Sequence, residues 1–90
     1  MTGDESRHRV RTVADIGRAA LGARKRSGLD QATASGLSGV GTRFLSELER
    51  GKETLRVGLV LKVLSRLGLE LWLVPRGGSL DGSDERGLRG

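Results

Sequence analysis

The side chains of this chain that could recognise another molecule are amides, hydroxyls and cations gathered within residues 31–52. Six positions there are candidates for contact with DNA, namely Gln31, Gly41, Thr42, Arg43, Ser46 and Lys52. Cationic, amide and hydroxyl groups donate hydrogen bonds to phosphate oxygens, and several of them also bond to base edges in the major groove. These residue types therefore indicate nucleic-acid binding rather than a reaction centre.

Two patterns that would indicate nucleotide binding are incomplete. Residues 51–54 read Gly-Lys-Glu-Thr, but Ser46 stands where a phosphate-binding loop needs its leading glycine, and Glu53 stands where it needs serine or threonine. The glycines within residues 36–41 do not form a dinucleotide-binding fingerprint, because its last glycine would fall on Phe44. Neither pattern supports a nucleotide cofactor.

Carboxylate, thiol and metal chemistry are not supported either. Glu47 and Glu49 are two residues apart, so on a helix their side chains diverge. The chain has no cysteine, which excludes disulfides, thiolate chemistry and cysteine-based zinc sites, and its single histidine, His8, cannot form a metal site alone. We expect a protein that is not an enzyme and that uses no metal and no cofactor.

The composition of the chain agrees with a polyanionic partner. The 90 residues carry a formal net charge of +5 with a sequence pI of about 11.0, which suits nucleic acid or an anionic membrane surface. No apolar run approaches the roughly 20 residues that span a bilayer, and the charged N-terminus lacks the apolar core of a secretion signal. We therefore expect no membrane partner and a cytoplasmic protein, associated with the nucleoid when bound to DNA.

Each candidate contact has an alternative interpretation. Gln31 is either a phosphate or base contact or a solvated helix former, and we favour contact. Arg43 pairs with a guanine or only with a phosphate, and the residue type does not decide between them. Ser46 is a phosphate or base contact, and Lys52 is expected to bind phosphate.

Neighbouring side chains are expected to have other roles. Phe44 is expected to pack in the core rather than touch a thymine methyl group, and Glu49 to form a structural ion pair with Arg50. Glu47 is unfavourable beside phosphates unless it accepts a hydrogen bond from cytosine or faces away from DNA. Trp72 is expected to pack in a dimer interface rather than stack on a base.

The elements that must position these residues are helices. Capping residues and helical spacing predict four of them: from the N-cap Thr12 to about residues 27–28, about 31–37 after the cap Asp30, from Gly41 to Gly51, and about 55–67 after the cap Thr54. The expected apolar stripes comprise Val13, Ile16, Gly17, Ala20, Leu21, Leu45, Leu48, Val57, Val60, Val63, Leu64 and Leu67. The two middle helices and their glycine turn have the order of a helix-turn-helix unit, whose second helix enters the major groove.

A strand is expected after the last helix, where the apolar pattern changes to alternation. The residues expected to dimerise there are Leu69, Leu71, Trp72, Leu73 and Val74. Because a lone strand is unstable in water, we expect it to pair with the same strand of a second copy across a two-fold axis. The predicted organisation is a disordered basic tail (1–11), an all-α domain with this one strand (12–75) and a flexible tail (76–90).

Two stretches of the chain resemble a known family. Gln31, Gly39-Val40, Leu45-Ser46 and the run Leu48–Lys52 resemble the Xre-type helix-turn-helix of phage repressors, and residues 61–71 are similar to HipB-type antitoxins. The resemblance covers roughly residues 13–74 and implies a lambda-repressor-like fold. It also implies a homodimeric antitoxin that binds a palindromic operator in double-stranded DNA, represses its own operon and binds a HipA-type serine/threonine kinase toxin.

The resemblance is incomplete in the second helix, and it leaves alternatives. Ala34, Ser35 and Ser38 stand where the family has larger or more apolar residues, so a less stable unit is expected. One alternative function is a phage-type transcriptional regulator without a toxin partner. Another is an interaction module that blocks a kinase and whose DNA binding has decayed.

Overall fold

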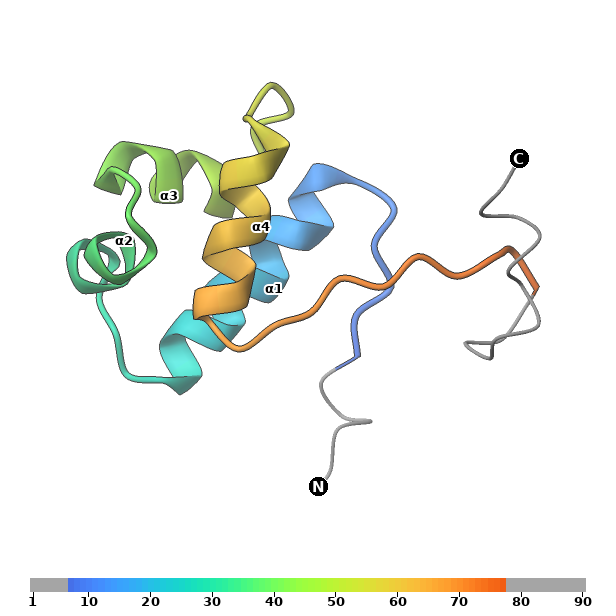
Figure 1. Cartoon of the computed structure of the whole chain (residues 1–90), viewed down its shortest axis with the longest axis horizontal. Helices are drawn as coiled ribbons and strands as arrows, with labels where there is room; N and C mark the ends of the chain where they lie inside the picture. The colour runs from blue at the N-terminus through green and yellow to red at the C-terminus, as the bar shows by residue number, and fades with distance from the viewer. Residues whose placement is uncertain (1–6, 78–90) are drawn as a thin grey trace.

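Four helices make up the part of the chain that the structure describes, as the sequence predicts. The computed structural model describes residues 7–77, whose helices are α1 (Val13–Arg26), α2 (Gln31–Ser38), α3 (Thr42–Glu49) and α4 (Val57–Arg66) (Figure 1). α1 packs against α3, α3 against α2, and α2 against α4. Residues 1–6 and 78–90, which belong to the two expected tails, lie outside the described residues. The all-α class is thus confirmed for the described part of the chain.

The start of α1 has the predicted capping box. The hydroxyl of Thr12 accepts a hydrogen bond from the backbone N–H of Asp15 at 3.2 Å, and the Asp15 carboxylate accepts one from the backbone N–H of Thr12 at 3.0 Å. Hydrogen bonds from the backbone of Arg11 and Thr12 lower the pKa of Asp15. At the other end, Gly28 has a φ of +70°, the left-handed conformation that ends the helix.

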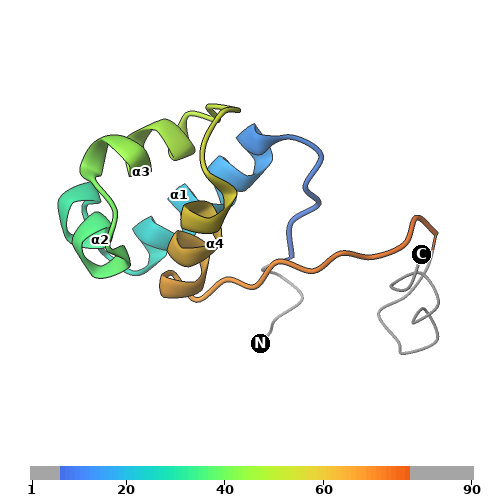
Figure 2. The same cartoon turned by 45° about the horizontal axis from the view of Figure 1, so that its top comes forward.

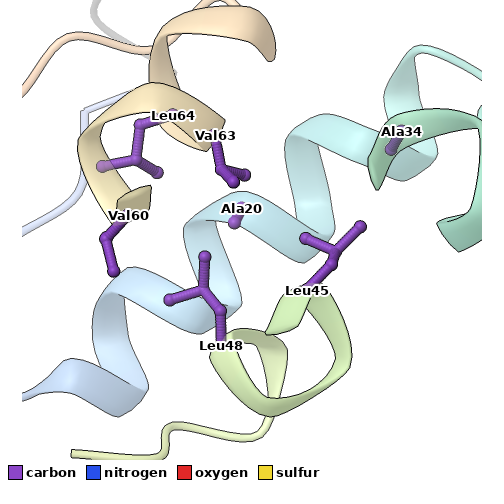
Figure 3. Packing of buried hydrophobic residues seen from close by; sticks show 7 residues of the cluster. All are labelled: Ala20, Ala34, Leu45, Leu48, Val60, Val63 and Leu64. Carbon is purple, nitrogen blue, oxygen red and sulfur yellow. The ribbon is translucent and has the colours of Figure 1, made fainter. Parts of the chain in front are cut away.

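The core lies where the four helices meet. Its buried apolar residues are Ala20, Ala34, Leu45, Leu48, Val60, Val63 and Leu64, seen together in Figure 3. Phe44 packs against this cluster as a partly buried side chain, as the sequence predicts. Alanines from α1 and α2 occupy part of the core, so these helices contribute little apolar volume and α3 and α4 supply the large side chains.

Glycines allow α1 to approach the end of α3 closely. A Cβ atom at Gly17 would overlap the carbonyl oxygen of Leu48, so no larger residue fits without a backbone shift. Gly51, just after α3, has a φ of +84°, and a Cβ there would lie 2.9 Å from the Cα of Ala14. These contacts fix where the end of α3 lies on α1.

The two serines of α2 differ in their hydrogen bonding. The hydroxyl of Ser35 donates to the carbonyl oxygen of Ala32 at 3.0 Å. Ser38 is buried, and within the described residues its hydroxyl has no hydrogen-bond partner. An unsatisfied buried hydroxyl costs free energy of folding, so the serine at this position weakens α2.

The fourth helix begins two residues later than predicted. Its N-cap is Arg56 in an extended conformation, and the expected cap Thr54 is exposed in the preceding loop. Leu55 packs against the core from that loop, while Val57, expected in the core, is 68% exposed in the first turn of the helix. The sequence prediction was wrong here because Leu55, in the loop before α4, packs against this end of the core in place of Val57.

The strand expected over Leu69–Val74 is not formed in the single chain. These residues have no regular secondary structure, and they extend away from the four helices in both views (Figures 1 and 2). A strand requires a neighbour for its backbone hydrogen bonds, and residues 7–77 contain no other strand. The single chain therefore does not show the predicted strand, and its pairing with a second copy remains a proposal.

Candidate nucleic-acid interface

The turn between α2 and α3 is tight and glycine-based. Gly39 ends α2 with a φ of +71°, and the backbone N–H of Val40 donates to the carbonyl oxygen of Ser35 at 3.0 Å. Gly41 is extended, and its carbonyl oxygen accepts from the backbone N–H of Leu45 at 3.2 Å as α3 begins. The chain therefore reverses direction between the helices within a few residues.

Side-chain hydrogen bonds fix both helices around this turn. Asp30 caps α2 by accepting from the backbone N–H of Thr33 at 2.7 Å, and this hydrogen bond lowers the pKa of Asp30. The hydroxyls of Ser35 and Thr42 share a hydrogen bond of 3.1 Å, which ties α2 to the first residue of α3. The Thr42 hydroxyl thus has a structural role in addition to its predicted place at the interface.

The first turn of α3 is exposed to solvent. Gly41, Thr42 and Arg43 are exposed, and the Arg43 side chain is 89% exposed. α3 begins without a side-chain cap, so its first backbone N–H groups have no side-chain acceptor. A helix N-terminus of this kind favours anions through its free N–H groups and its dipole. Ser46, one turn later, is half-buried.

Glu47 lies between two of the predicted DNA contacts. Its Oε2 atom accepts from Nε of Arg43 at 3.3 Å and from Nζ of Lys52 at 3.3 Å. Partial burial acts to raise the pKa of Glu47, but the hydrogen bonds from Lys52 and Arg43 outweigh it, and the pKa is lowered. Glu47, whose role the sequence left open, is therefore hydrogen-bonded to both cations in the free protein.

The ion pair expected between Glu49 and Arg50 is replaced by one with Arg24. Nε of Arg24 donates to Oε2 of Glu49 at 2.6 Å, in a pair whose side chains are 10% and 6% exposed. The amide nitrogen of Gln31 donates to Oε1 of Glu49 at 2.8 Å. The expected pair does not form because Arg50 is exposed after the helix end, whereas Glu49 faces α1 and the start of α2. Gln31, a predicted DNA contact, is thus half-buried and bonded within the fold.

Two residues near the interface were missed from sequence. Arg24, in the last turn of α1, donates not only to Glu49 but also to the carbonyl oxygen of Leu29 at 2.8 Å, just before α2. Lys62 of α4 lies over the turn, because a Cβ on Gly39 would be 2.8 Å from its Nζ atom. Both come from outside the α2–α3 segment, so spacing within that segment carried no signal for them.

These features define the class of protein. Two short helices joined by a tight glycine turn, with a solvent-exposed arginine opening the second, form a helix-turn-helix domain. None of the helices in residues 7–77 is both long and apolar enough to cross a membrane. Across the same residues, no group of acidic or histidine side chains could hold a metal ion.

Comparison with known proteins places the chain in a family. No protein-family model matches it. It is 42% identical over 69 residues to the uncharacterized HTH-type transcriptional regulator y4mF of Sinorhizobium fredii, in a match that covers 77% of this chain and 91% of that protein. The chain therefore belongs to the helix-turn-helix-type transcriptional regulators.

A solved structure supports the same assignment. The fold is similar to that of the restriction-modification controller protein C.AhdI from Aeromonas hydrophila, with a TM-score of 0.57 and 28% sequence identity. The match covers 64% of this chain and 84% of that one. Regulators of this kind act by binding DNA, and the relatives give no indication of catalysis.

Proposed function

We propose that this regulator binds a palindromic DNA operator as a homodimer and that the first turn of α3 recognises the bases. The observation that carries the proposal is the 89% exposure of the Arg43 side chain at the uncapped start of α3. This is the end of the second helix that faces base edges in helix-turn-helix complexes. Base recognition by Arg43 is accompanied by phosphate contacts from the backbone of Gly41 and Thr42 and from Lys52.

The remaining candidates have supporting positions in this arrangement. Gln31 retains one amide hydrogen and its carbonyl oxygen for DNA after donating to Glu49. Ser46 lies one turn beyond Thr42 and is half-buried, so its contact with DNA is limited to the hydroxyl. Lys62, over the turn, adds a further cation beside the interface. Acting at an operator, the protein works in the cytoplasm at the nucleoid.

Dimerisation through residues 69–74 is supported by exposed apolar surface. Leu71, Trp72, Leu73 and Val74 are 44%, 63%, 89% and 45% exposed. Together with Leu61 of α4, the beginning of this segment borders a hollow of about 400 Å³. Pairing of two such segments as antiparallel strands satisfies their backbone groups and covers this apolar surface. As in other helix-turn-helix dimers, we expect the half-sites to lie about one helical turn apart, roughly 34–36 Å.

Replacing Arg43 tests the docking of α3. Arg43→Ala is expected to relax base preference at one position of the operator, whereas Lys52→Ala is expected to weaken binding to all duplexes alike and to reduce the salt dependence. Arg18→Ala, on α1, is the matched control because it removes the same charge from an exposed side chain. Fluorescence anisotropy with operator and mismatched duplexes measures each effect. An Arg43→Ala protein with unchanged affinity and unchanged preference would show that α3 docks differently.

We further propose that the regulator is an antitoxin with a HipA-type kinase partner. The similarity of residues 61–71 to HipB-type antitoxins supports this, whereas the likeness to a restriction-modification controller favours a regulator without a toxin. Co-purification from the native host distinguishes them, since recovery of a kinase with the regulator is expected only for the antitoxin. A protein that binds the kinase but no duplex in a mobility-shift assay would instead be an interaction module.

A further inference from the structure

Glu47 connects the two proposed DNA-binding cations through a single atom. Arg43 and Lys52 both lie 3.3 Å from its Oε2 atom, and Glu47 is 19% exposed while Arg43 is 89% exposed. The carboxylate is therefore partly enclosed, and the arginine it holds extends into solvent. Within residues 7–77, the hydrogen bond of the Arg43 side chain is made by Nε alone.

Helix stability does not explain this pair. Arg43 is in the first turn of α3 and Glu47 is near its end, so each charge lies at the end of the helix dipole that disfavours it. The order of arginine before glutamate is also the weaker of the two arrangements at this spacing. An exposed pair of this kind adds little to folding. The arrangement therefore suits a role outside the stability of the helix.

The geometry of the pair leaves a recognition group free. With Nε directed to Glu47, the two terminal nitrogens of the guanidinium form a planar pair of donors. Guanine presents O6 and N7 as two neighbouring acceptors in the major groove, and it is the base that arginine binds with two hydrogen bonds. The same planar pair can also bind a phosphate. The position of Arg43 favours guanine, because the exposed first turn of α3 is the part of the helix that faces base edges.

We propose that Glu47 is a positioning residue that holds Arg43 for recognition of a guanine in the operator. The inference rests on the proposed docking of α3 and decides between the guanine and phosphate contacts of Arg43. Lys52 donates a separate hydrogen bond to the same carboxylate oxygen. When Lys52 binds a phosphate instead, the hydrogen bond between Arg43 and Glu47 is kept. Glu47 thereby contributes to base preference although its own carboxylate touches no base.

Base preference in Glu47 variants tests this proposal. The probe is an operator duplex selected from random sequences, with each G·C pair replaced in turn. In the wild type, one guanine replacement is expected to weaken binding about 10- to 100-fold, in line with a two-bond arginine contact. Glu47→Ala is expected to reduce that factor to less than about 3-fold while the penalties at other positions stay unchanged. Glu47→Gln, which keeps an acceptor, is expected to give an intermediate factor.

Controls separate positioning from charge and from folding. Glu53→Ala removes the same charge from an exposed loop residue just after Lys52 and is expected to leave the guanine penalty unchanged. Thermal unfolding checks that Glu47→Ala is folded, and unaltered penalties at other positions show that α3 still docks.

The outcomes also distinguish this inference from the proposed function. If Arg43→Ala abolishes the guanine preference and Glu47→Ala preserves it in full, the positioning role is wrong and the docking stands. If neither variant changes any base preference, the docking of α3 itself is wrong. Equal loss of preference in Glu47→Ala and Glu53→Ala would assign the effect to net charge and overturn the positioning role.

Discussion

At the scale of single residues, Glu49 joins three segments that are distant in sequence. Its carboxylate accepts from Nε of Arg24 at 2.6 Å and from the amide of Gln31 at 2.8 Å. Arg24 also donates to the carbonyl oxygen of Leu29 at 2.8 Å. These bonds hold the end of α3, the last turn of α1 and the entry into α2 in one arrangement. The position of the helix-turn-helix unit on α1 thus depends on this carboxylate.

Removing Arg24 is expected to destabilise the fold strongly. Arg24→Ala leaves the nearly buried Glu49 carboxylate without its cation, and breaking such a pair costs about 3–5 kcal/mol. Urea unfolding followed by circular dichroism measures the loss. Arg18→Ala, which removes an exposed partner of Asp15 on the same helix, is expected to cost less than about 1 kcal/mol. Equal losses in the two variants would mean that the Arg24–Glu49 pair does not hold the helices together.

At the scale of elements, the contact of α1 with α3 depends on Gly17. Gly17→Ala places a methyl group against the carbonyl oxygen of Leu48, and we expect a loss of at least about 2 kcal/mol in the free energy of unfolding. Gly36→Ala is the matched variant, because a Cβ there meets no atom within 4 Å, on an exposed face of α2. It is expected to stabilise by about 0.5–1 kcal/mol. Thermal unfolding measures both effects. A Gly17→Ala protein as stable as the wild type would contradict the packing of α1 on α3.

The helix boundaries that could be predicted are those set by local chemistry. Thr12 and Asp15 cap each other across one turn, and Gly28 ends α1 in the left-handed conformation. The start of α4 was mispredicted, because Leu55 is apolar for a reason that spacing does not reveal. It packs on the core from a loop. Sequence patterns identify local caps well and cannot tell an apolar loop residue from the first turn of a helix.

The candidate interface was predicted in part for the same reason. The position of Arg43 at the start of α3 could be predicted from the turn that precedes it, and the side chain is exposed there. The partner of Glu49 was assigned to the adjacent Arg50, although the acceptor faces Arg24, 25 residues earlier in the chain. Lys62 was not considered, since it reaches the turn from α4. Contacts that depend on packing between helices are not encoded in local spacing.

At the scale of the whole molecule, residues 69–74 form an apolar segment that is largely exposed to solvent. The four helices bury their core without it, and the segment extends from them into solvent (Figure 2). Of this segment, Leu69 packs partly against the core, and the four apolar side chains that follow remain 44% to 89% exposed. In the proposed dimer, a second copy of the chain would supply both a pairing strand and the apolar cover.

Removal of this segment is expected to give monomers. Deleting residues 69–74 is expected to convert the dimer to a monomer in sedimentation experiments, because both the strand and the apolar side chains are lost. Trp72→Pro keeps Leu69 on the core and removes one backbone donor from the strand, so it tests pairing in a folded domain. Dimers that persist in both variants would rule out strand pairing as the dimer contact.

The most direct test of the central claim is selection of binding sites by the wild-type protein from random-sequence duplexes, read by sequencing. A homodimer that reads bases with α3 is expected to enrich an inverted repeat whose half-sites are about 10–10.5 base pairs apart, centre to centre. Each half-site is expected to contain a guanine whose enrichment is lost in Arg43→Ala. Recovery of no enriched motif, or of one motif without a symmetric counterpart, would contradict sequence-specific operator binding by a two-fold dimer.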